Sequence, residues 1–537
     1  MTLTPIPPTT LTDDDDARER GGETPRSSNG NRHVLWIALL VVAVSFGSFF
    51  MDGNTGINLA DEGYLWYGMT ALKTGQIPIR DFHAYDPGRY FWVTGWSYLL
   101  GDSLVSMRAA CVLFQCLGMT CALLAVRRIS REWWFLGLVA LILVQWMSPQ
   151  YKLFEQSVGL MAIYMAVRLI ERPTVRQYFF TGTFIGLMAF FGRNHGLYQV
   201  SAFTLLTVLL SRGEWTKLPR RVLTCAGGIV VGYLPQMMML AFVHGYLGAY
   251  VTQLQTDLAG RSGLPSPVPW PWLVPAQLPG FLQCGLLAEG VFYLLLPTFV
   301  VVALVRSWWM GREGLARHPL LPAAACVTMF YAQHSFARPE WVHLAHSVPG
   351  MILGVIALCH AAGLKAPRWL PVAGAIALLA LTVPARAIYS GLVNEMLAPA
   401  GAFVETEVRG QTMHVAKYHA GILKMAHRVA DELAKSDETV VFLPHWPGLY
   451  PATGRFSPLY QIYFIVGMPE AEEDATIARF KEARVKWVVL QDYALDGRDD
   501  LRFYRTNPRI FAYLRANFTP VPTPEMPPNT ILLRLND

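Results

Sequence analysis

The sequence predicts an all-α polytopic membrane bundle of about 11 spans, followed by a small C-terminal α/β domain. Of the 537 residues, 53% are hydrophobic and only 15% are charged, well below the quarter that is typical of soluble domains. Apolar runs recur from residue 34 to residue 390, each close to the roughly 20 residues that a helical span needs. From residue 396 onward the composition becomes that of a soluble protein.

The N-terminal segment 1–33 is polar and includes the acidic run Asp13–Asp16. Such a composition buries too little apolar surface to fold, which predicts a disordered cytoplasmic tail. The first apolar run, VLWIALLVVAVSFGSFFM (34–51), ends in bulky residues rather than in a small-residue cleavage site. It is therefore predicted to be a retained first span and not a signal peptide.

The transmembrane domain is predicted to extend over residues 34–395. Its links carry more Lys and Arg on the side that a cytoplasmic N-terminus would leave inside, for example Arg127, Arg128 and Arg131. This asymmetry orients a helical bundle, and after 11 crossings the C-terminal domain would lie outside. The further spans are expected at 104–126, 133–148, 155–170, 177–192, 196–211, 221–243, 288–306, 319–334, 343–363 and 369–390.

Two predicted outer loops are large, near 52–103 and 244–287. The first contains YLWYGMTALKTG and YFWVTGWSYLL, which suit helices at the membrane interface. The second contains GLPSPVPWPWLVPAQLPG, where the prolines oppose helix and Trp270 and Trp272 favour the headgroup layer.

The C-terminal domain is predicted to span residues 396–537. A helical pattern over 404–435 precedes two buried strands, ETVVFLP (438–444) and VKWVVLQD (485–492), with a third strand at NTILLRL. The helical segment EEDATIARFKEA (472–483) lies just before the second strand, and this alternation favours an α/β fold. The residues His445, Trp446 and Tyr450 follow a strand end, where they either contact a sugar or form a proline-stiffened surface loop.

Composition also excludes some functions. The net charge of +6 comes from basic residues spread over short links, so no nucleic-acid surface is predicted. All seven cysteines lie in or beside apolar segments without metal-ligand spacing. They are interpreted as small buried hydrophobic residues rather than as a disulfide framework.

The residues most informative about chemistry follow the first span. Asp61 and Glu62 begin the first outer loop, and Asp81, Asp86 and Arg89 follow within it. Acidic loop residues are usually just solvated. Placing carboxylates beside a bilayer and among aromatic residues costs desolvation energy, however. Residues kept in such unfavourable places commonly have a function.

This loop resembles the C-type glycosyltransferase superfamily. The resemblance comprises the acidic pair, the aromatic-rich helix, Tyr-x-Pro-Gly-Arg-Tyr at 85–90 and Gly-x-Ser-x-x-x-x-Arg in GDSLVSMR (101–108). It is similar to the bacterial branch that includes protein mannosyltransferases and lipid A aminoarabinose transferases. A later stretch, FARPEWVHLAHSVPG (336–350), is similar to an Arg-x-acid-x-x-His segment at the outer face of related proteins.

The resemblance implies a sugar donor linked to polyprenyl phosphate, used at the periplasmic face of a bacterial inner membrane. The acceptor would be a glycan, lipid or protein of the cell envelope. Transfer needs a base for the acceptor proton and positive charge near the departing phosphate. Direct displacement of the phosphate would invert the anomeric centre.

The resemblance also assigns roles to individual residues. Asp61 would be the catalytic base, while Glu62 either assists it or fixes a neighbouring helix, and Asp86 orients the acceptor or helps to hold a metal. Donor phosphate would be bound by Arg89, with Arg338, His343, His346 and Arg193 as further candidates.

Plainer interpretations stay open for several of these residues. Arg89 can extend to lipid headgroups, His346 can be a hydrogen-bonded core histidine, and Arg193 with His195 can anchor a span end. The three acids Asp61, Glu62 and Asp86 are of the type that binds a hard cation, yet three separated carboxylates are a poor predictor of a metal site. A divalent cation is left open and no other cofactor is predicted.

Two other functions compete with the transferase. A flippase or transporter of lipid-linked sugars would show ionisable residues at mid-bilayer and two matching halves, which the sequence lacks. A polymerase or ligase of lipid-linked glycans would concentrate arginines and histidines in a late outer loop. Here the acids of the first loop dominate.

Overall fold

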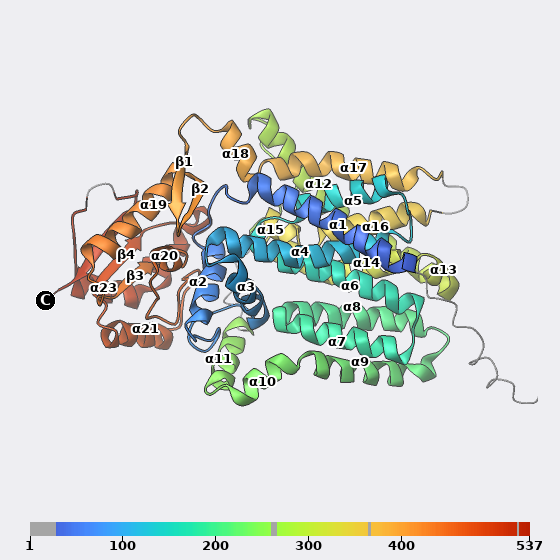
Figure 1. The fold of residues 1–537 in the computed structure, drawn as a ribbon, viewed down its shortest axis with the longest axis horizontal. Coiled ribbons are helices and arrows are strands. Elements are labelled where there is room, and N and C mark those ends of the chain that lie inside the picture. The colour runs from blue at the N-terminus through green and yellow to red at the C-terminus, as the bar shows by residue number, and fades with distance from the viewer. Residues whose placement is uncertain (1–27, 259–265, 363–366, 524–525, 537) are drawn as a thin grey trace, which may run out of the picture.

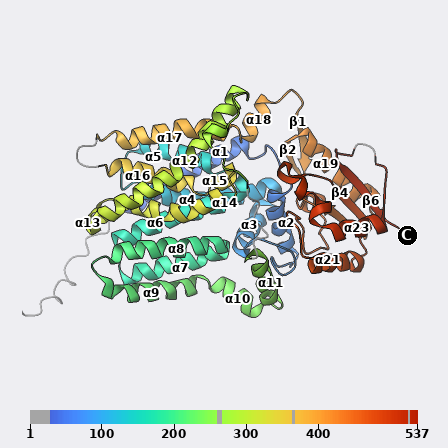
Figure 2. The same cartoon turned by 180° about the vertical axis from the view of Figure 1, so that it is seen from behind.

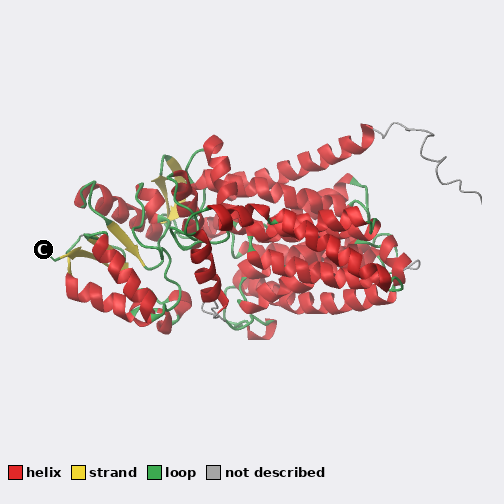
Figure 3. Cartoon of the chain, turned by 90° about the horizontal axis from the view of Figure 1, so that it is seen from below, coloured by secondary structure: helices red, strands yellow, loops and turns green. Residues whose placement is uncertain are grey.

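The computed structural model describes residues 28–258, 266–362, 367–523 and 526–536. Long helices run along the length of the molecule, and the C-terminal domain lies at one end of this bundle (Figure 1). The start of α1 lies at the opposite end (Figure 1). Strands are confined to the half that holds the C-terminal domain (Figure 3).

The bundle contains eleven long or medium helices that match the predicted spans in order. They are α1 (Ser28–Asp52), α4 (Leu104–Val126), α5 (Trp133–Trp146), α6 (Leu153–Glu171), α7 (Val175–Phe191), α8 (Arg193–Ser211), α9 (Leu218–Gly232), α12 (Gly280–Trp309), α14 (Leu320–Ala337), α16 (Val348–His360) and α17 (Leu370–Ala387). Shorter helices connect them: α2 (Asp61–Lys73), α3 (Pro87–Leu100), α10 (Leu234–Phe242), α11 (Tyr246–Leu258), α13 (Gly311–Arg317), α15 (Trp341–Leu344) and α18 (Gly391–Leu397).

The predicted count of 11 membrane spans is not supported. Within the described residues, five helices are long and apolar enough to cross a membrane, or six if the bent pair α9 and α10 forms one span. The five are α1, α4, α6, α12 and α17. The helices α5, α7 and α16 are shorter than 18 residues, whereas α8 and α14 carry polar residues at one end, including Asn194, His195 and His334.

The predicted N-terminal tail lies mostly outside the described residues. Residues 28–33, assigned to that tail from composition, form the first turns of α1 instead. In Figure 3 the N-terminal part of α1 diverges from its neighbours, and only 22% of its most apolar window is buried inside the protein. A surface of this kind suits contact with lipid.

Helices α7 and α9 pack with their backbones in contact because glycines face each other. A Cβ atom added at Gly182 would lie 2.0 Å from the Cys225 carbonyl oxygen, and one at Gly232 would lie 2.0 Å from the Thr183 carbonyl oxygen. Gly186 and Gly228 meet backbone atoms at 2.2 Å in the same way. Small residues four apart are a common device for close helix packing in membranes.

The C-terminal domain contains a four-stranded sheet in the order β3-β4-β6-β5 (Figure 2). β3 and β4 are parallel, and β6 runs antiparallel to both β4 and β5. The three predicted strands are confirmed as β3 (Val440–Leu443), β4 (Trp487–Gln491) and β6 (Thr530–Leu535), and β5 (Phe518–Pro520) adds an edge. The helices of the domain are α19 (Lys417–His427), α20 (Leu449–Thr453), α21 (Glu470–Glu482), α22 (Phe503–Thr506) and α23 (Pro508–Asn517).

The predicted helix over 404–435 is wrong in its first part. Residues 403–416 form an antiparallel hairpin of β1 (Phe403–Val408) and β2 (Gln411–Ala416). Arg409 and Gly410 both have positive φ, 50° and 77°, as the tight turn of a two-residue hairpin requires. Helix begins only at Lys417.

The C-terminal domain packs directly on α2. A Cβ atom at Gly63 would lie 2.4 Å from the Gly448 nitrogen, and that nitrogen donates to the Leu59 carbonyl at 2.9 Å. Residues 62–71 of α2 are all buried. The helix expected at the membrane interface is therefore enclosed between the bundle and the C-terminal domain, because its glycine admits the backbone of that domain.

Candidate active site

The candidate site lies where the bundle meets the C-terminal domain. The elements that form it are the start of α2, the start of α3, the short turn 150–152 before α6, the segment from the end of α14 through α15, and the loops after β3. These segments are far apart in sequence. Their side chains come together around Asp61.

Asp61 is a partly exposed carboxylate between the helical bundle and the C-terminal domain. Its Oδ2 atom lies 3.4 Å from Lys152 Nζ, and its side chain is 25% exposed. Tyr463 of the C-terminal domain lies close enough to act on its pKa. Burial raises the pKa of Asp61, but the charges of Lys152 and Arg338 and the hydrogen bonds from Lys152 and Tyr463 outweigh burial and bring it below its usual range. The group is therefore ionised at neutral pH.

Local hydrogen bonds fix the position of Asp61 at the start of α2. The Asn58 side-chain oxygen accepts from the backbone nitrogens of Ala60 and Asp61, both at 3.0 Å. The Asn58 amide donates to the Tyr151 hydroxyl at 3.1 Å. An anion in the first turn of a helix is also stabilised by the helix dipole.

Glu62 has a different environment, although it is the next residue. Arg108 donates to its carboxylate from Nε at 2.6 Å and from Nη2 at 2.7 Å, and both side chains are less than 5% exposed. Arg108 also donates to the carbonyls of Gly53 and Gly56 at 2.8 and 2.9 Å. Of its two predicted roles, the geometry favours fixing neighbouring segments.

Asp86 pairs with Arg193 across two loops. Its Oδ1 lies 2.8 Å from Arg193 Nε, and its Oδ2 accepts from the Arg193 backbone nitrogen at 3.0 Å. Arg193 also pairs with Asp257 at 3.0 Å. Asp86 and Arg193 therefore join α3, α8 and α11, and the two acids leave little of the Arg193 charge for a phosphate.

Arg89 is neutralised inside the bundle. Its Nη1 donates to Glu155 at 2.9 Å and its Nε donates to the Phe191 carbonyl at 3.0 Å. The two charged side chains are 9% and 10% exposed. The charge of Arg89 is already balanced by Glu155, which disfavours the predicted contact with donor phosphate. A contact with lipid headgroups would require an exposed Arg89 side chain, and this side chain is buried.

Arg338 is a partly exposed cation at the end of α14. It pairs with Glu340 at 3.4 Å and, across to the C-terminal domain, with Asp496 at 3.2 Å. Its side chain is 28% exposed, so a ligand can reach it. Its charge acts on Asp61, which places Arg338 near the carboxylate.

The two predicted histidines lie side by side and are joined by a third. The rings of His343 and His346 are 5.4 Å apart, and His334 lies 5.6 Å from the first and 4.9 Å from the second. His343 Nδ1 is 2.7 Å from a Glu340 oxygen. His346 is only 4% exposed, and among the described residues both of its ring nitrogens lack a hydrogen-bond partner. The ring is buried, as the plainer interpretation of a core histidine expected.

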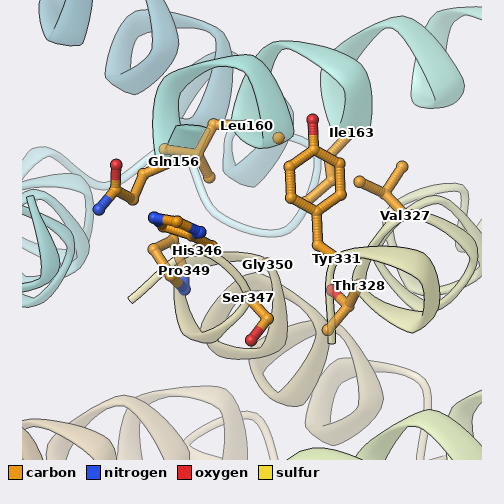
Figure 4. A pocket seen from close by; sticks show the side chains of 11 residues that line it. Gln156, Leu160, Ile163, Val327, Thr328, Tyr331, His346, Ser347, Pro349 and Gly350 are labelled. Carbon is orange, nitrogen blue, oxygen red and sulfur yellow. The ribbon is translucent and has the colours of Figure 1, made fainter. Parts of the chain in front are cut away.

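A small polar cavity lies beside His346, between α6, α14 and α16. Figure 4 shows Gln156 next to His346 and, across the space, Tyr331 and Thr328. The cavity measures about 10 Å³, roughly the space of one water molecule. Within the described part of the chain, the Gln156 amide and the Thr328 hydroxyl also lack partners. A bound water would satisfy them.

The C-terminal residues His445, Trp446 and Tyr450 do not form an exposed loop. They are 5%, 5% and 1% exposed. The Tyr450 hydroxyl accepts from the Phe442 backbone nitrogen at 3.1 Å, so it supports the domain core. Only His445 faces the site, where its ring lies 5.9 Å from that of Tyr463.

Four site residues were not predicted from the sequence: Lys152, Glu155, His334 and Tyr463. The first two form a Lys-x-x-Glu pattern at the start of an apolar run, and polar residues there are a signal that hydropathy alone overlooks. Tyr463 carries no local signal, since it reaches Asp61 only through the packing of the C-terminal domain.

The three predicted acids are not gathered into one metal site. Asp61, Glu62 and Asp86 each pair with a different cation, Lys152, Arg108 and Arg193. In the ranges that the structure describes, no group of three or more His, Cys, Asp or Glu side chains is placed to hold a metal ion.

No family model and no curated protein matches the sequence. Among solved structures, the chain is similar to ArnT from Cupriavidus metallidurans in the apo state, with a TM-score of 0.48, 13% identity and coverage of 94% of this chain and 98% of that one. ArnT bound to undecaprenyl phosphate gives a TM-score of 0.45, 14% identity and the same coverage. The archaeal oligosaccharyltransferase AglB from Archaeoglobus fulgidus, in complex with an inhibitory peptide and a dolichol-phosphate, gives 0.47 and 12% identity, covering 95% of this chain and 75% of that one.

Proposed function

We propose that this protein is an inverting membrane glycosyltransferase that moves a sugar from a polyprenyl-phosphate donor to a cell-envelope acceptor. The observation that carries the proposal is the environment of Asp61. This carboxylate is held ionised at the mouth of a membrane bundle, with one cation at 3.4 Å and a second nearby. A base beside fixed positive charge is what transfer from a sugar phosphate requires.

In the proposed reaction Asp61 takes the proton from an acceptor hydroxyl or amine as that group attacks the anomeric carbon of the donor sugar. The bond between this carbon and the phosphate oxygen breaks, and polyprenyl phosphate leaves with the bonding electron pair. One displacement without a covalent sugar intermediate inverts the anomeric centre. The protonated Asp61 then returns its proton to water.

Lys152 and Arg338 are the cations that the proposal assigns to the departing phosphate. Lys152 is 14% exposed and Arg338 is 28% exposed, so both are held by the protein and still reachable. Negative charge grows on the phosphate as the bond breaks, and preorganised cations stabilise that charge. The proposal keeps His343 and His346 as further candidates for donating to phosphate oxygens. Arg89, whose charge Glu155 already matches, supports this group rather than binding the donor.

The proposal places the site at the periplasmic face of a bacterial inner membrane, with the N-terminus in the cytoplasm. Two observations support this orientation. The start of α1 and the C-terminal domain lie at opposite ends of the bundle (Figure 1). A cluster of Lys217, Arg221 and Arg312 around Glu214 belongs to links expected on the inside, where basic residues accumulate.

The test is sugar transfer in proteoliposomes, from a panel of labelled synthetic polyprenyl-phosphate donors. Asp61→Asn removes the charge and keeps the shape, so we expect transfer or donor hydrolysis to fall by roughly 10² to 10⁴-fold. Asp81→Asn is the matched control, because Asp81 lies in the same loop but pairs with Arg80 at 2.7 Å. The control should keep its activity.

Each result of this experiment decides between alternatives. If Asp61→Asn remains as active as the unmodified protein, Asp61 is not the base. If the unmodified protein transfers no sugar from any donor but moves a labelled lipid between leaflets, the protein is a flippase and the transferase proposal is wrong. Size-exclusion chromatography in detergent shows whether each variant is folded.

A further inference from the structure

The parallel strands β3 and β4 end at the same edge of the C-terminal sheet. Leu443, the last residue of β3, lies opposite Leu490 of β4, one residue before that strand ends. The two loops that follow, 444–448 after β3 and 492–496 after β4, therefore begin side by side. We call these two loops the carboxyl edge. In open α/β sheets, ligands bind outside the carboxyl ends of the strands, where loops carry the binding residues.

The carboxyl edge contacts the bundle at two residues of the candidate site region. In the loop after β3, the Gly448 nitrogen donates to the carbonyl of Leu59 at 2.9 Å, two residues before Asp61. In the loop after β4, Asp496 pairs with Arg338 at 3.2 Å. One loop is therefore bonded next to the proposed base, and the other to a proposed phosphate cation.

Two exposed tyrosines lie at the end of β4. They are Tyr493, in the loop after the strand, and Tyr418 of α19. The Tyr418 hydroxyl accepts from the amide of Gln491, the last residue of β4, at 2.5 Å, so this ring is held at the strand end. A single exposed aromatic residue is ordinary on a protein surface. Two of them at one strand end, beside a loop that contacts the bundle, offer flat faces to a ligand.

A buried histidine lies next to Tyr493. The ring of His445 is 6.3 Å from that of Tyr493 and 5.9 Å from that of Tyr463, edge to face in both cases. His445 is 5% exposed, and among the described residues no hydrogen bond of normal geometry occupies either ring nitrogen. A buried polar group without a hydrogen bond costs free energy, and a hydroxyl group of a ligand would remove that cost.

We propose that the carboxyl edge is the acceptor subsite and that it takes a saccharide, with Tyr493 stacked on a sugar ring and His445 bonded to a sugar hydroxyl. This inference rests on the proposed function, because it brings the acceptor hydroxyl to Asp61. A sugar ring has an apolar face of C–H groups and a rim of hydroxyls. An aromatic ring beside a small number of polar groups matches both.

A peptide acceptor fits the carboxyl edge less well. Extended peptides bind through backbone hydrogen bonds to an open strand, and backbone groups beside this edge are already bonded within the domain. The Asp492 nitrogen donates to the Asn529 carbonyl at 2.8 Å. The Pro444 carbonyl accepts from the Phe464 nitrogen at 3.0 Å. Side chains are then the contacts that a ligand finds there, which favours a saccharide.

The experiment measures binding by saturation-transfer difference NMR, with the protein in nanodiscs. The probes are the methyl glycosides of a hexose, a pentose and a 2-amino hexose, and a short peptide that contains Ser and Thr. We expect a glycoside to bind to the unmodified protein. Tyr493→Ala should weaken this binding about three- to tenfold, as for the loss of an aromatic contact, whereas Tyr493→Phe should keep it. Tyr504→Ala is the matched control, since the described contacts of Tyr504, with Phe511 and Arg505, stay within α22 and α23.

A second variant tests the histidine. His445→Leu replaces an unpaired buried imidazole with an apolar side chain, so the unfolding temperature should not fall. Binding of the same glycoside should weaken by about fivefold, as for the loss of one hydrogen bond. A purely structural role of His445 would give the opposite result, a lower unfolding temperature with unchanged binding.

Several results would overturn the inference. They are a protein that binds none of the glycosides, a protein that binds only the peptide, a Tyr493→Ala variant that binds as tightly as the unmodified protein, and an equal loss in Tyr504→Ala. Failure of the proposed function looks different. The unmodified protein would then bind a glycoside in a Tyr493-dependent way but transfer no sugar from any donor in proteoliposomes.

Discussion

Glu62 and Asp61 are adjacent in sequence, but their carboxylates differ in burial and in how closely each is paired. Glu62 is enclosed with Arg108 and bonded at 2.6 and 2.7 Å, whereas Asp61 is a quarter exposed and paired at 3.4 Å. A buried, fully matched charge holds segments together, while an accessible one with a loose partner can exchange it for a substrate. The motif in the sequence contains both residues and does not distinguish them.

The first prediction at this scale concerns stability. Glu62→Gln leaves Arg108 buried with an uncompensated charge, and breaking a buried pair costs about 3 to 5 kcal/mol. We expect a clear drop in the thermal unfolding temperature in detergent. Glu171→Gln is the control, since Glu171 pairs with Arg128 in the same two-contact geometry, at 2.8 and 3.0 Å, but both side chains are at least 26% exposed. That change should cost about 1 kcal/mol or less. Equal losses in the two variants would contradict the distinction by burial.

At the residue scale, the sequence predicted Asp61 as a site residue but did not predict the residues that surround it. Asp61 is marked by its place after a span and by the motif around it. Lys152 lies 91 positions later and Tyr463 more than 400 positions later, and no local pattern connects them to the acid. Pairing over such separations depends on tertiary packing.

Among the elements, helices α7 and α9 give the clearest link from sequence to packing. At these glycines the backbone atoms of one helix contact the backbone atoms of the other, so no flexible side chain can move aside there. Hydropathy predicts both helices well. It does not predict their partners, because an apolar surface packs equally well on lipid or on another helix.

This interface gives the second prediction. A Cβ atom at Gly186 would lie 2.2 Å from the Ile229 carbonyl oxygen, so Gly186→Ala must separate the helices. We expect a lower unfolding temperature and less folded protein in the membrane fraction. In contrast, a Cβ atom at Gly137 of α5 meets nothing within 4 Å, and Gly137→Ala should be neutral or slightly stabilising through helix propensity. A Gly186→Ala protein as stable as the unmodified one would show that the two helices are not in close contact.

The hairpin at 403–416 shows that the periodicity of apolar residues alone did not distinguish strand from helix in this segment. The residues of β1 alternate in exposure, yet a helical period can also be fitted to the longer stretch 404–435. The turn Arg409-Gly410 carries the decisive information, since both residues adopt positive φ. The three core strands were predicted correctly because their apolar runs are continuous.

At the scale of the whole molecule, an ion pair joins the end of α14 to the C-terminal domain. Arg338 of the bundle bonds Asp496 of the C-terminal domain at 3.2 Å. With exposures of 28% and 46%, this pair contributes about 1 kcal/mol or less to stability. In the proposed reaction, the donor phosphate would displace Asp496 from Arg338 at small cost.

The third prediction follows from this competition. Asp496→Asn removes the competing charge, and Asn tolerates the positive φ of 54° at this position. We expect tighter binding of polyprenyl phosphate, by a few-fold, with an unchanged unfolding temperature. The measurement is equilibrium binding of a labelled polyprenyl phosphate to the protein in nanodiscs. Asp499→Asn is the control, because the ion pairs of Asp499 among the described residues, with Arg502 and Arg505, stay within its own turn. Equal affinity in all three proteins would exclude Arg338 as a phosphate contact or Asp496 as its competitor.

The contact between Gly63 and Gly448 also limits which C-terminal domains could replace the present one. A side chain of any size at residue 63 would displace the domain that carries Tyr463. A foreign C-terminal domain joined to this bundle would therefore need its own glycine at the same point, whatever its overall fold. The same pair of glycines shows where a chimeric protein would first fail.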